Sequence, residues 1–210
     1  MGLFLEEIVN TYQAGEIKSS FSNEQIKDIV FTSLAQTNRF NGITKVPYCT
    51  MTHSFAVGKL AYDYATIYHN YQQHTKDKIK LFGYMHDMGE TIIGDVVYPL
   101  KSGDFKKNVK TFEDIEKAFL IFLGEKVFGI KNFQNEYEYF YPLIKKADDY
   151  LGLFELIGIS KNTSGFESSV FFADANLFRW GLTQFGFKME FEGLLEKVLK
   201  EQSKDEKRKI

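Results

Sequence analysis

The chain has 210 residues, of which 44% are hydrophobic and 26% are charged, and its formal net charge is −2. This balance is typical of a soluble globular domain, and 21 Phe and 12 Tyr provide a large apolar core. The small net charge argues against binding to duplex nucleic acid, and no apolar run approaches the roughly 20 residues of a membrane helix. A lone Cys49 excludes an internal disulfide and favours a reducing cytoplasm.

Helical periodicity dominates the sequence and predicts an all-α protein, a compact helical bundle. We expect three parts: a helical extension over residues 1–37, a core with C-terminal helices over residues 38–202, and a charged, frayed tail over residues 203–210. The first strong helix signal is Ser22 followed by Gln25, which has the form of a capping box ahead of apolar residues at helical spacing.

The next expected helix carries His53 in its first turn, capped by Thr50 or Thr52. A polar loop over residues 70–78 and a short apolar helix over residues 79–85 should follow.

That short helix delivers His86 and Asp87 at its C-terminal end. Residues 95–104 are expected to form a loop, with a weak strand signal at residues 96–98.

The second half of the chain is expected to contain four helices. The first spans about residues 108–123, and the second spans about residues 136–157, with Pro142 near its start or kinking it. Asp148 falls on the apolar face of this second helix. The last pair is expected over residues 167–183 and 190–200.

Four side chains from three of these helices form a candidate metal site: His53, His86, Asp87 and Asp148. Helical bundles build metal sites from residues on facing helices in this way. Two imidazoles and two carboxylates suit one divalent ion of intermediate softness, such as Mn, Fe, Co, Ni or Zn. Such an ion activates water for hydrolysis.

Taken one by one, these residues have ordinary explanations. A His-Asp dipeptide arises by chance, and a histidine at a helix start is more often a capping or surface residue. Asp148 differs, because aspartate on a buried face needs a partner or a metal. The four residues together, in this order, favour the metal site. His69 and His74 lie in polar surroundings and are expected to be solvated, which argues against a second metal.

The motifs resemble those of the HD-domain metal-dependent phosphohydrolases, and most closely the small bacterial 5′-deoxynucleotidases. The likeness extends over about residues 38–156. The matching segments are Arg39-Phe40, Thr52-His53-Ser54, residues 86–95 with Pro99 and Lys101 behind them, residues 115–117 and Lys146-Ala147-Asp148. The resemblance implies that His53, His86, Asp87 and Asp148 hold the metal.

The same resemblance implies roles for five further residues. Glu90 would orient or deprotonate the attacking water, and Asp95 would contact the sugar or assist the leaving oxygen. Arg39 would hold the phosphate, because a guanidinium matches phosphate oxygens in a planar fork. Lys101 would add a second positive charge. Phe40 stands where the family has Trp, so it keeps an apolar wall for the sugar without the indole donor.

The resemblance implies a cytoplasmic, metal-dependent hydrolase that cleaves deoxyribonucleoside 5′-monophosphates and assembles as a homodimer or higher oligomer. Thr52 replaces a glutamate of the family beside the metal. Three alternatives stay open at this point. One is a triphosphohydrolase that releases triphosphate from a deoxynucleoside triphosphate. Another is a nucleotide-binding HD module without catalysis. The third is a helical interaction protein without a metal.

Overall fold

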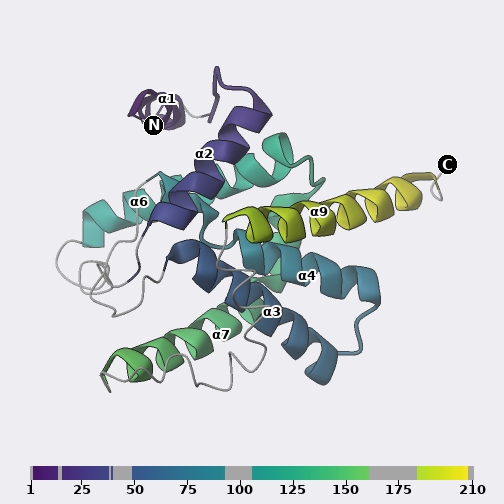
Figure 1. Cartoon of the computed structure of the whole chain (residues 1–210). Coiled ribbons are helices and arrows are strands. Elements are labelled where there is room, and N and C mark those ends of the chain that lie inside the picture. The colour runs from purple at the N-terminus through teal and green to yellow at the C-terminus, as the bar shows by residue number, and fades with distance from the viewer. Residues whose placement is uncertain are drawn as a thin grey trace.

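A computed structural model describes residues 2–13, 16–37, 39, 49–92, 106–160 and 184–207 of the chain. Within these ranges every element is a helix and none is a strand, which confirms the predicted all-α fold (Figure 1). The elements are α1 (Gly2–Gln13), α2 (Asn23–Gln36), α3 (Thr50–Tyr68), α4 (Gln73–Met85), the 3₁₀ turn η2 (Met88–Thr91), α6 (Lys106–Phe122), the π-helical turn η3 (Leu123–Val127), α7 (Phe133–Ser160) and α9 (Gln184–Lys207). Among the described helices, none combines the length and apolar character needed to cross a bilayer.

The start of α2 follows the predicted capping box. The Ser22 hydroxyl accepts a hydrogen bond from the Gln25 amide, and the Gln25 side chain accepts one from the Ser22 amide. These two bonds satisfy backbone donors that a helix start leaves without partners. Beyond this cap, α2 buries an apolar face that includes Val30 and Leu34.

The predicted threonine cap of α3 is wrong. Cys49 occupies the N-cap position, and its sulfur lies 3.3 Å from the Thr52 hydroxyl without capping a backbone amide of the helix, which begins at Thr50. The Thr50 amide instead donates to the carbonyl oxygen of Thr37, the residue that ends α2, at 2.9 Å. This backbone contact satisfies one of the amides that a helix start leaves without partners, and it ties the start of α3 to the end of α2.

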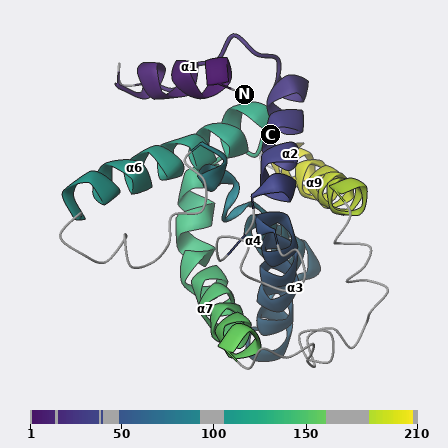
Figure 2. The same cartoon turned by 60° about the vertical axis from the view of Figure 1, so that its left-hand side comes forward.

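Helices α3 and α4 form an antiparallel pair that lies against α7 (Figure 2). They approach closely because a glycine faces a glycine where they cross. A Cβ added at Gly83 would lie 2.6 Å from the Cα of Gly58, so any side chain there would push the helices apart. This crossing lies five residues after His53 and three residues before His86, and it brings the two histidines toward each other.

Helix α4 begins earlier than its apolar residues suggest. The predicted loop over residues 70–78 is wrong from Gln73 onward, because Gln73 to Lys78 already belong to α4. These residues are polar since they form the solvent side of the first turns, while Ile79 and Leu81 are fully buried. His74 is exposed, as expected for a solvated histidine, but it lies on this helix.

Helix α7 runs through Pro142 without interruption. It begins at Phe133, three residues before the expected start and nine before Pro142, so the proline does not lie near the start of the helix, and the alternative of a kink stays a prediction. Phe133 is fully buried and packs its ring edge-on against Phe82 of α4, with ring centroids 5.0 Å apart. This aromatic contact secures the turns ahead of the proline, where helix propensity alone is weak.

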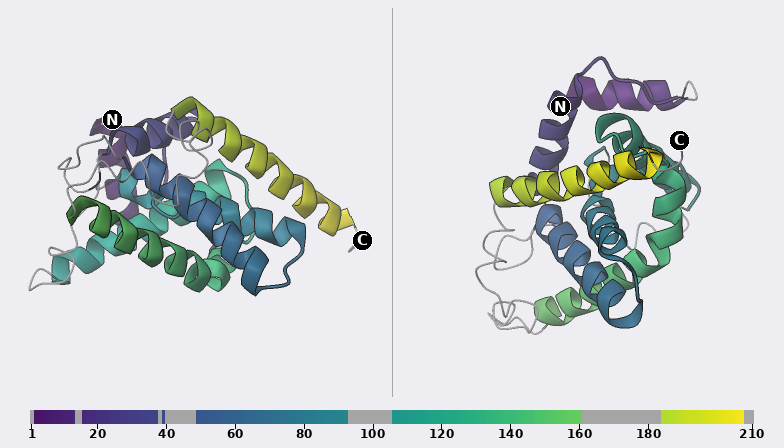
Figure 3. Two further views of the ribbon diagram at one scale, coloured as in Figure 1. Left: turned by 60° about the horizontal axis from the view of Figure 1, so that its bottom comes forward. Right: turned by 90° about the vertical axis from the view of Figure 1, so that its right-hand side faces the viewer.

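Helix α9 crosses over α3 and α4 and completes the aromatic core (Figure 3). Phe187 and Phe191 are fully buried, and both rings pack edge-on against Phe31 of α2. The same helix is fastened to α4 by Glu190, which accepts hydrogen bonds from Tyr84 at 2.7 Å and from Lys80 at 2.6 Å.

Some expectations cannot be compared with the described residues. The predicted helix over residues 167–183 and the weak strand signal at residues 96–98 lie outside them. The final helix is longer than predicted: it starts at Gln184 and continues to Lys207, so the segment expected to fray from Ser203 onward is helical for five residues. The three-part division of the chain stays a prediction.

Candidate metal centre

Three helical segments bring the four predicted ligands to one place. His53 comes from the first turns of α3, and Asp148 comes from the middle of α7. His86 and Asp87 form the turn that directly follows α4. Gly89, two residues further on, lets this turn approach α6, since an added Cβ there would lie 2.6 Å from the Glu116 carbonyl oxygen.

The ligand atoms of His53, His86 and Asp148 all lie within 4.8 Å of one another. The Nε2 atom of His53 is 3.0 Å from Oδ1 of Asp148, and the Nε2 atom of His86 is 4.0 Å from the same oxygen. Asp87 is not a member of this tightest group, but its carboxylate reaches both rings, at 3.1 Å from His86 and 3.7 Å from His53. The arrangement resembles a coordination sphere, with two nitrogens and carboxylate oxygens around a common point.

Hydrogen bonds on the far side of each ring orient the two imidazoles. The Nδ1 atom of His53 lies 2.6 Å from a carboxylate oxygen of Glu155, and the Nδ1 atom of His86 lies 2.8 Å from the carbonyl oxygen of Gly83. Since both of these oxygens only accept, Nδ1 carries the proton in each ring. Each Nε2 is therefore the atom that can offer a lone pair to a metal.

Two buried atoms at the centre, Nε2 of His86 and Oδ2 of Asp87, make no hydrogen bond of good geometry within the described part of the chain. Both lie beside charged groups, at 3.1 Å from Oδ1 of Asp87 and 3.5 Å from Arg39, but these contacts are ion pairs only. Buried polar atoms without partners are rare, and they call for an explanation such as an ion. A divalent cation between the rings and the carboxylates would satisfy both atoms. The residues present therefore fit a metal ion of the kind that accepts mixed nitrogen and oxygen ligands.

Burial and neighbouring charged groups shift the pKa values of the side chains in the cluster. Burial and the Arg39 charge both lower the pKa of His53, but Glu155 and Asp148 outweigh them and raise it from 6.5 to about 9. Burial raises the pKa of Asp148, yet hydrogen bonds from His53 and Lys145 and the nearby imidazoles hold it far below its usual value. Without a metal, the cluster therefore favours a protonated His53 between ionised carboxylates.

Lys145 fixes the orientation of Asp148. Its ammonium group lies 2.7 Å from Oδ2 of Asp148 and 2.7 Å from a carboxylate oxygen of Asp149. Because Oδ2 is engaged in this way, Oδ1 is the oxygen that faces the histidines. Asp148 is thus arranged to offer a metal one oxygen rather than two.

Arg39 and Glu155 border the cluster. One guanidinium nitrogen of Arg39 lies 3.5 Å from Asp87, and another lies 3.3 Å from Glu155. Glu155 is fully buried and was not among the residues singled out from the sequence. A usable signal existed, since Glu155 follows Asp148 by seven residues, or two helical turns, and so shares its face of α7.

Of the remaining predicted site residues, Glu90 lies within the described part of the chain. Glu90 lies in η2, and its amide donates to the Asp87 carbonyl at 3.0 Å, so it directly follows the ligand turn. Phe40, Asp95 and Lys101 lie outside the described residues.

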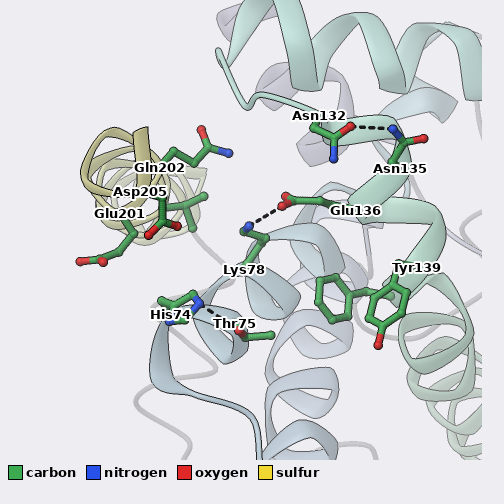
Figure 4. Close-up of a pocket in the computed structure, with 12 residues that line it drawn as sticks. His74, Thr75, Lys78, Asn132, Asn135, Glu136, Tyr139, Glu201, Gln202 and Asp205 are labelled. Atoms are coloured by element: carbon green, nitrogen blue, oxygen red, sulfur yellow. Dashed lines mark hydrogen bonds and ion pairs between the residues drawn. The ribbon is translucent and has the colours of Figure 1, made fainter. Parts of the chain in front are cut away.

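A separate polar cavity of about 390 Å³ lies near the other end of α4 (Figure 4). It is bordered by α4, α7 and α9, and Lys78 and Glu136 form an ion pair of 2.8 Å in its wall. None of the predicted site residues lines it. The lining residues are His74, Thr75, Lys78, Asn132, Asn135, Glu136, Tyr139, Phe140, Val198, Glu201, Gln202 and Asp205.

Comparison with known proteins agrees with this geometry. The description "5′-deoxynucleotidase YfbR-like" belongs to a family model that matches residues 31–155, more than half of the chain. This stretch runs from the middle of α2 to Glu155 and contains His53, His86, Asp87 and Asp148. No curated protein and no solved structure matches the chain. Members of the matching family are HD-domain hydrolases that use a divalent metal, and the extent of the match places this chain among them: it belongs to the YfbR-like 5′-deoxynucleotidase family.

Proposed function

We propose that the protein hydrolyses deoxyribonucleoside 5′-monophosphates to deoxynucleosides and inorganic phosphate. One observation carries the proposal: ligand atoms of His53, His86 and Asp148 gather within 4.8 Å of one another on three separate helical segments. Family membership supports a phosphohydrolase of the deoxynucleotidase type. The monophosphate is the simplest substrate for such a site.

We assign His53, His86, Asp87 and Asp148 as the ligands of one divalent ion, either Co, Mn, Zn, Fe or Ni. When bound, the ion supplies Lewis acidity to a phosphoryl oxygen and to a water molecule. The protein's own contribution is to turn the two Nε2 atoms toward the ion and to keep the carboxylates ionised. Its hydrogen bonds from Nδ1 of both rings serve that purpose.

Glu90 is proposed as the general base. It follows Asp87 within the η2 turn, one turn away from the ligand pair. In the proposed reaction its carboxylate takes a proton from the attacking water, whose oxygen bonds to phosphorus as the bond from phosphorus to the 5′ oxygen breaks. A proton then reaches the leaving 5′ oxygen, and Asp95 is proposed to assist there.

Arg39 is proposed to bind the phosphate. Its guanidinium lies at the border of the cluster, 3.5 Å from Asp87, where a phosphoryl group bound to the metal would meet it. Lys101 would add charge on the substrate side, and Phe40 would form an apolar wall against the sugar. We further propose a cytoplasmic enzyme that assembles as a homodimer or higher oligomer.

The test is turnover by protein stripped of metal and reloaded with Co²⁺, Mn²⁺ or Zn²⁺. We expect hydrolysis of dAMP with release of inorganic phosphate, and slower hydrolysis of AMP. Ion-exchange separation of the products from dATP gives the counter-test. Release of inorganic triphosphate from dATP, with no turnover of any deoxynucleoside monophosphate, would overturn the proposal in favour of a triphosphohydrolase.

A further inference from the structure

We propose that Glu155 is a positioning residue that sets the metal-binding form of His53 and the placement of Arg39 through one buried carboxylate. The inference rests on the proposed function, because it gives a purpose to the ligand and to the phosphate-binding arginine. It concerns a residue that is not itself a metal ligand and that carries no other assigned role.

The geometry divides the two oxygens of Glu155 between two donors. Oε1 lies 2.6 Å from Nδ1 of His53, and Oε2 lies 3.3 Å from a guanidinium nitrogen of Arg39. The three residues come from distant parts of the chain, with separations of 102 and 116 positions from Glu155. One carboxylate of α7 thus joins the start of α3 to the segment that precedes it.

Burial makes this arrangement informative. The side chains of Glu155 and His53 are both fully buried. A carboxylate removed from water loses its hydration, and only charge-assisted hydrogen bonds of good geometry offset that loss. An apolar residue would fill the same position in a helix face without such a cost. The presence of a glutamate therefore points to a use for its charge and its two acceptors.

The use follows from what each bond controls. The bond to Nδ1 keeps the proton on that nitrogen, so Nε2 remains the metal-binding atom and becomes a better electron donor. The bond to Arg39 fixes the guanidinium beside Asp87, at the place assigned to the phosphate. Loss of Glu155 should therefore weaken metal binding and anion binding together. Loss of Arg39 should weaken anion binding alone.

The experiment compares Glu155→Gln with Arg39→Lys and with a matched control, Glu190→Gln. Glu190 also accepts hydrogen bonds from one cation and one neutral donor, Lys80 and Tyr84, but it fastens α9 to α4 instead of bordering the cluster. Co²⁺ affinity is measured on metal-stripped protein by competition with a chromogenic chelator. The binding of inorganic phosphate to the Co²⁺-loaded protein is measured by calorimetry.

We expect Glu155→Gln to weaken Co²⁺ binding by about 10–100-fold, the usual cost of removing a group that orients a ligating histidine. Phosphate binding by the Co²⁺-saturated variant should also weaken. Arg39→Lys should weaken phosphate binding only, and Glu190→Gln should change neither. Wild-type Co²⁺ affinity in Glu155→Gln would overturn the inference, as would an equal loss of affinity in Glu190→Gln.

A measurement on the unaltered chain covers the case in which Glu155→Gln does not fold. Long-range nitrogen–proton NMR of the Zn²⁺-loaded protein should show the proton of His53 on Nδ1, and a proton on Nε2 would overturn the inference. None of these measurements uses turnover. Failure of dAMP hydrolysis would therefore count against the proposed function, whereas normal metal and phosphate binding by Glu155→Gln would count against the role of Glu155.

Discussion

The two ends of α4 carry two very different polar regions. At the C-terminal end, His86 and Asp87 join His53 and Asp148 in a buried cluster with atoms that lack partners within the described chain. Near the N-terminal end, His74 and Lys78 border an open cavity of about 390 Å³ (Figure 4). There Lys78 and Glu136 form an ion pair of 2.8 Å.

The difference shows that concavity alone does not define a functional site. The cavity offers space and polar side chains, but along the Lys78–Glu136 pair one glutamate oxygen accepts from the lysine and only the other is buried without a hydrogen bond from the described residues. In the cluster, two buried atoms of proposed ligands, Nε2 of His86 and Oδ2 of Asp87, make no hydrogen bond within the described residues, and they lie beside the hydrogen-bonded His53 and Asp148. Buried polar atoms that converge are the stronger sign of chemistry.

The largest contrast should come from one histidine at each end of α4. We expect His86→Ala to abolish metal-dependent hydrolysis, a fall of about 10³-fold or more, because the ion supplies several kcal/mol of charge stabilisation. His74→Ala should leave both metal content and turnover unchanged. Metal analysis of both variants with assays on dAMP checks the comparison, and substantial activity in metal-loaded His86→Ala would contradict it.

A smaller contrast is expected for two glutamates. Glu90→Gln should lower kcat by about 10²–10⁴-fold, the range for loss of a general base, while metal content stays normal. Glu136→Gln, in the wall of the cavity, should keep the wild-type kcat. Steady-state kinetics with Co²⁺-loaded protein separate the two variants. Equal kcat values would show that Glu90 takes no proton in the reaction.

The closeness of α3 and α4 can be tested with two glycines. Gly83→Ala places a methyl group 2.6 Å from the Gly58 backbone, so we expect a loss of about 1–3 kcal/mol in stability from overpacking. Metal affinity should fall with it, because the crossing positions His53 and His86. Gly193→Ala on α9 meets nothing within 4 Å and should stabilise the helix by roughly 0.5–1 kcal/mol. Urea unfolding of both variants, followed by circular dichroism, measures these opposite signs.

The pH dependence of the metal-free protein should report on the cluster. The pKa of His53 is raised from 6.5 to about 9, so the folded protein holds a proton that the unfolded chain loses in this window. The stabilising contribution is therefore complete below pH 6.5 and is lost as pH rises toward 9. Metal affinity should change in the opposite direction, because the ion competes with the proton on Nε2.

At the acid end, the pKa values of Asp87 and Asp148 are lowered in the folded protein. Their contribution to the free energy of unfolding is therefore present above about pH 4 and is lost as the pH falls further. Urea unfolding of metal-free protein at several pH values measures both arms. His53→Gln is the control, since it should remove the decline between pH 6.5 and 9. An unchanged decline in that variant would assign the effect to another group.

The smallest effect is expected at the cavity itself. Lys78→Ala removes a partly exposed ion pair, and such pairs contribute about 1 kcal/mol or less. We expect a slight fall in melting temperature and no change in turnover or metal content. Differential scanning calorimetry and the dAMP assay check this. A loss of turnover in Lys78→Ala would give the cavity a functional role that its geometry does not suggest.

The fold class and the helical segments that carry the four ligand candidates could be predicted because helix signals depend on residues close together in the sequence. The capping box at Ser22 and the placement of His86 and Asp87 after an apolar helix follow from short-range rules. The polar start of α4 was missed because exposed helix turns and loops share a composition. The wrong cap of α3 has a different cause. The Thr37 carbonyl that accepts from the first amide of this helix lies thirteen residues away, beyond the reach of a local capping pattern.

Glu155 and Lys145 were missed for a different reason. Glu155 contacts residues that become its neighbours only in the folded chain. Lys145 is close to Asp148 in the sequence, but its role is clear only when Asp148 is known to face the cluster. A glutamate two turns after Asp148 could have been flagged as a polar residue on an apolar face. Its partners, His53 and Arg39, lie more than a hundred positions away, and no periodicity in one sequence links them to it.

The aromatic contacts of α9 have a practical consequence for protein engineering. The segment that defines the family stops at Glu155, whereas Phe187 and Phe191, which fill the middle of the molecule, come more than thirty positions later. A truncated version ending with the family segment would leave the ring of Phe31 facing water. It would also lose the hydrogen bonds that Glu190 accepts from Lys80 and Tyr84 of α4. A minimal catalytic fragment of this enzyme must therefore keep its C-terminal helix.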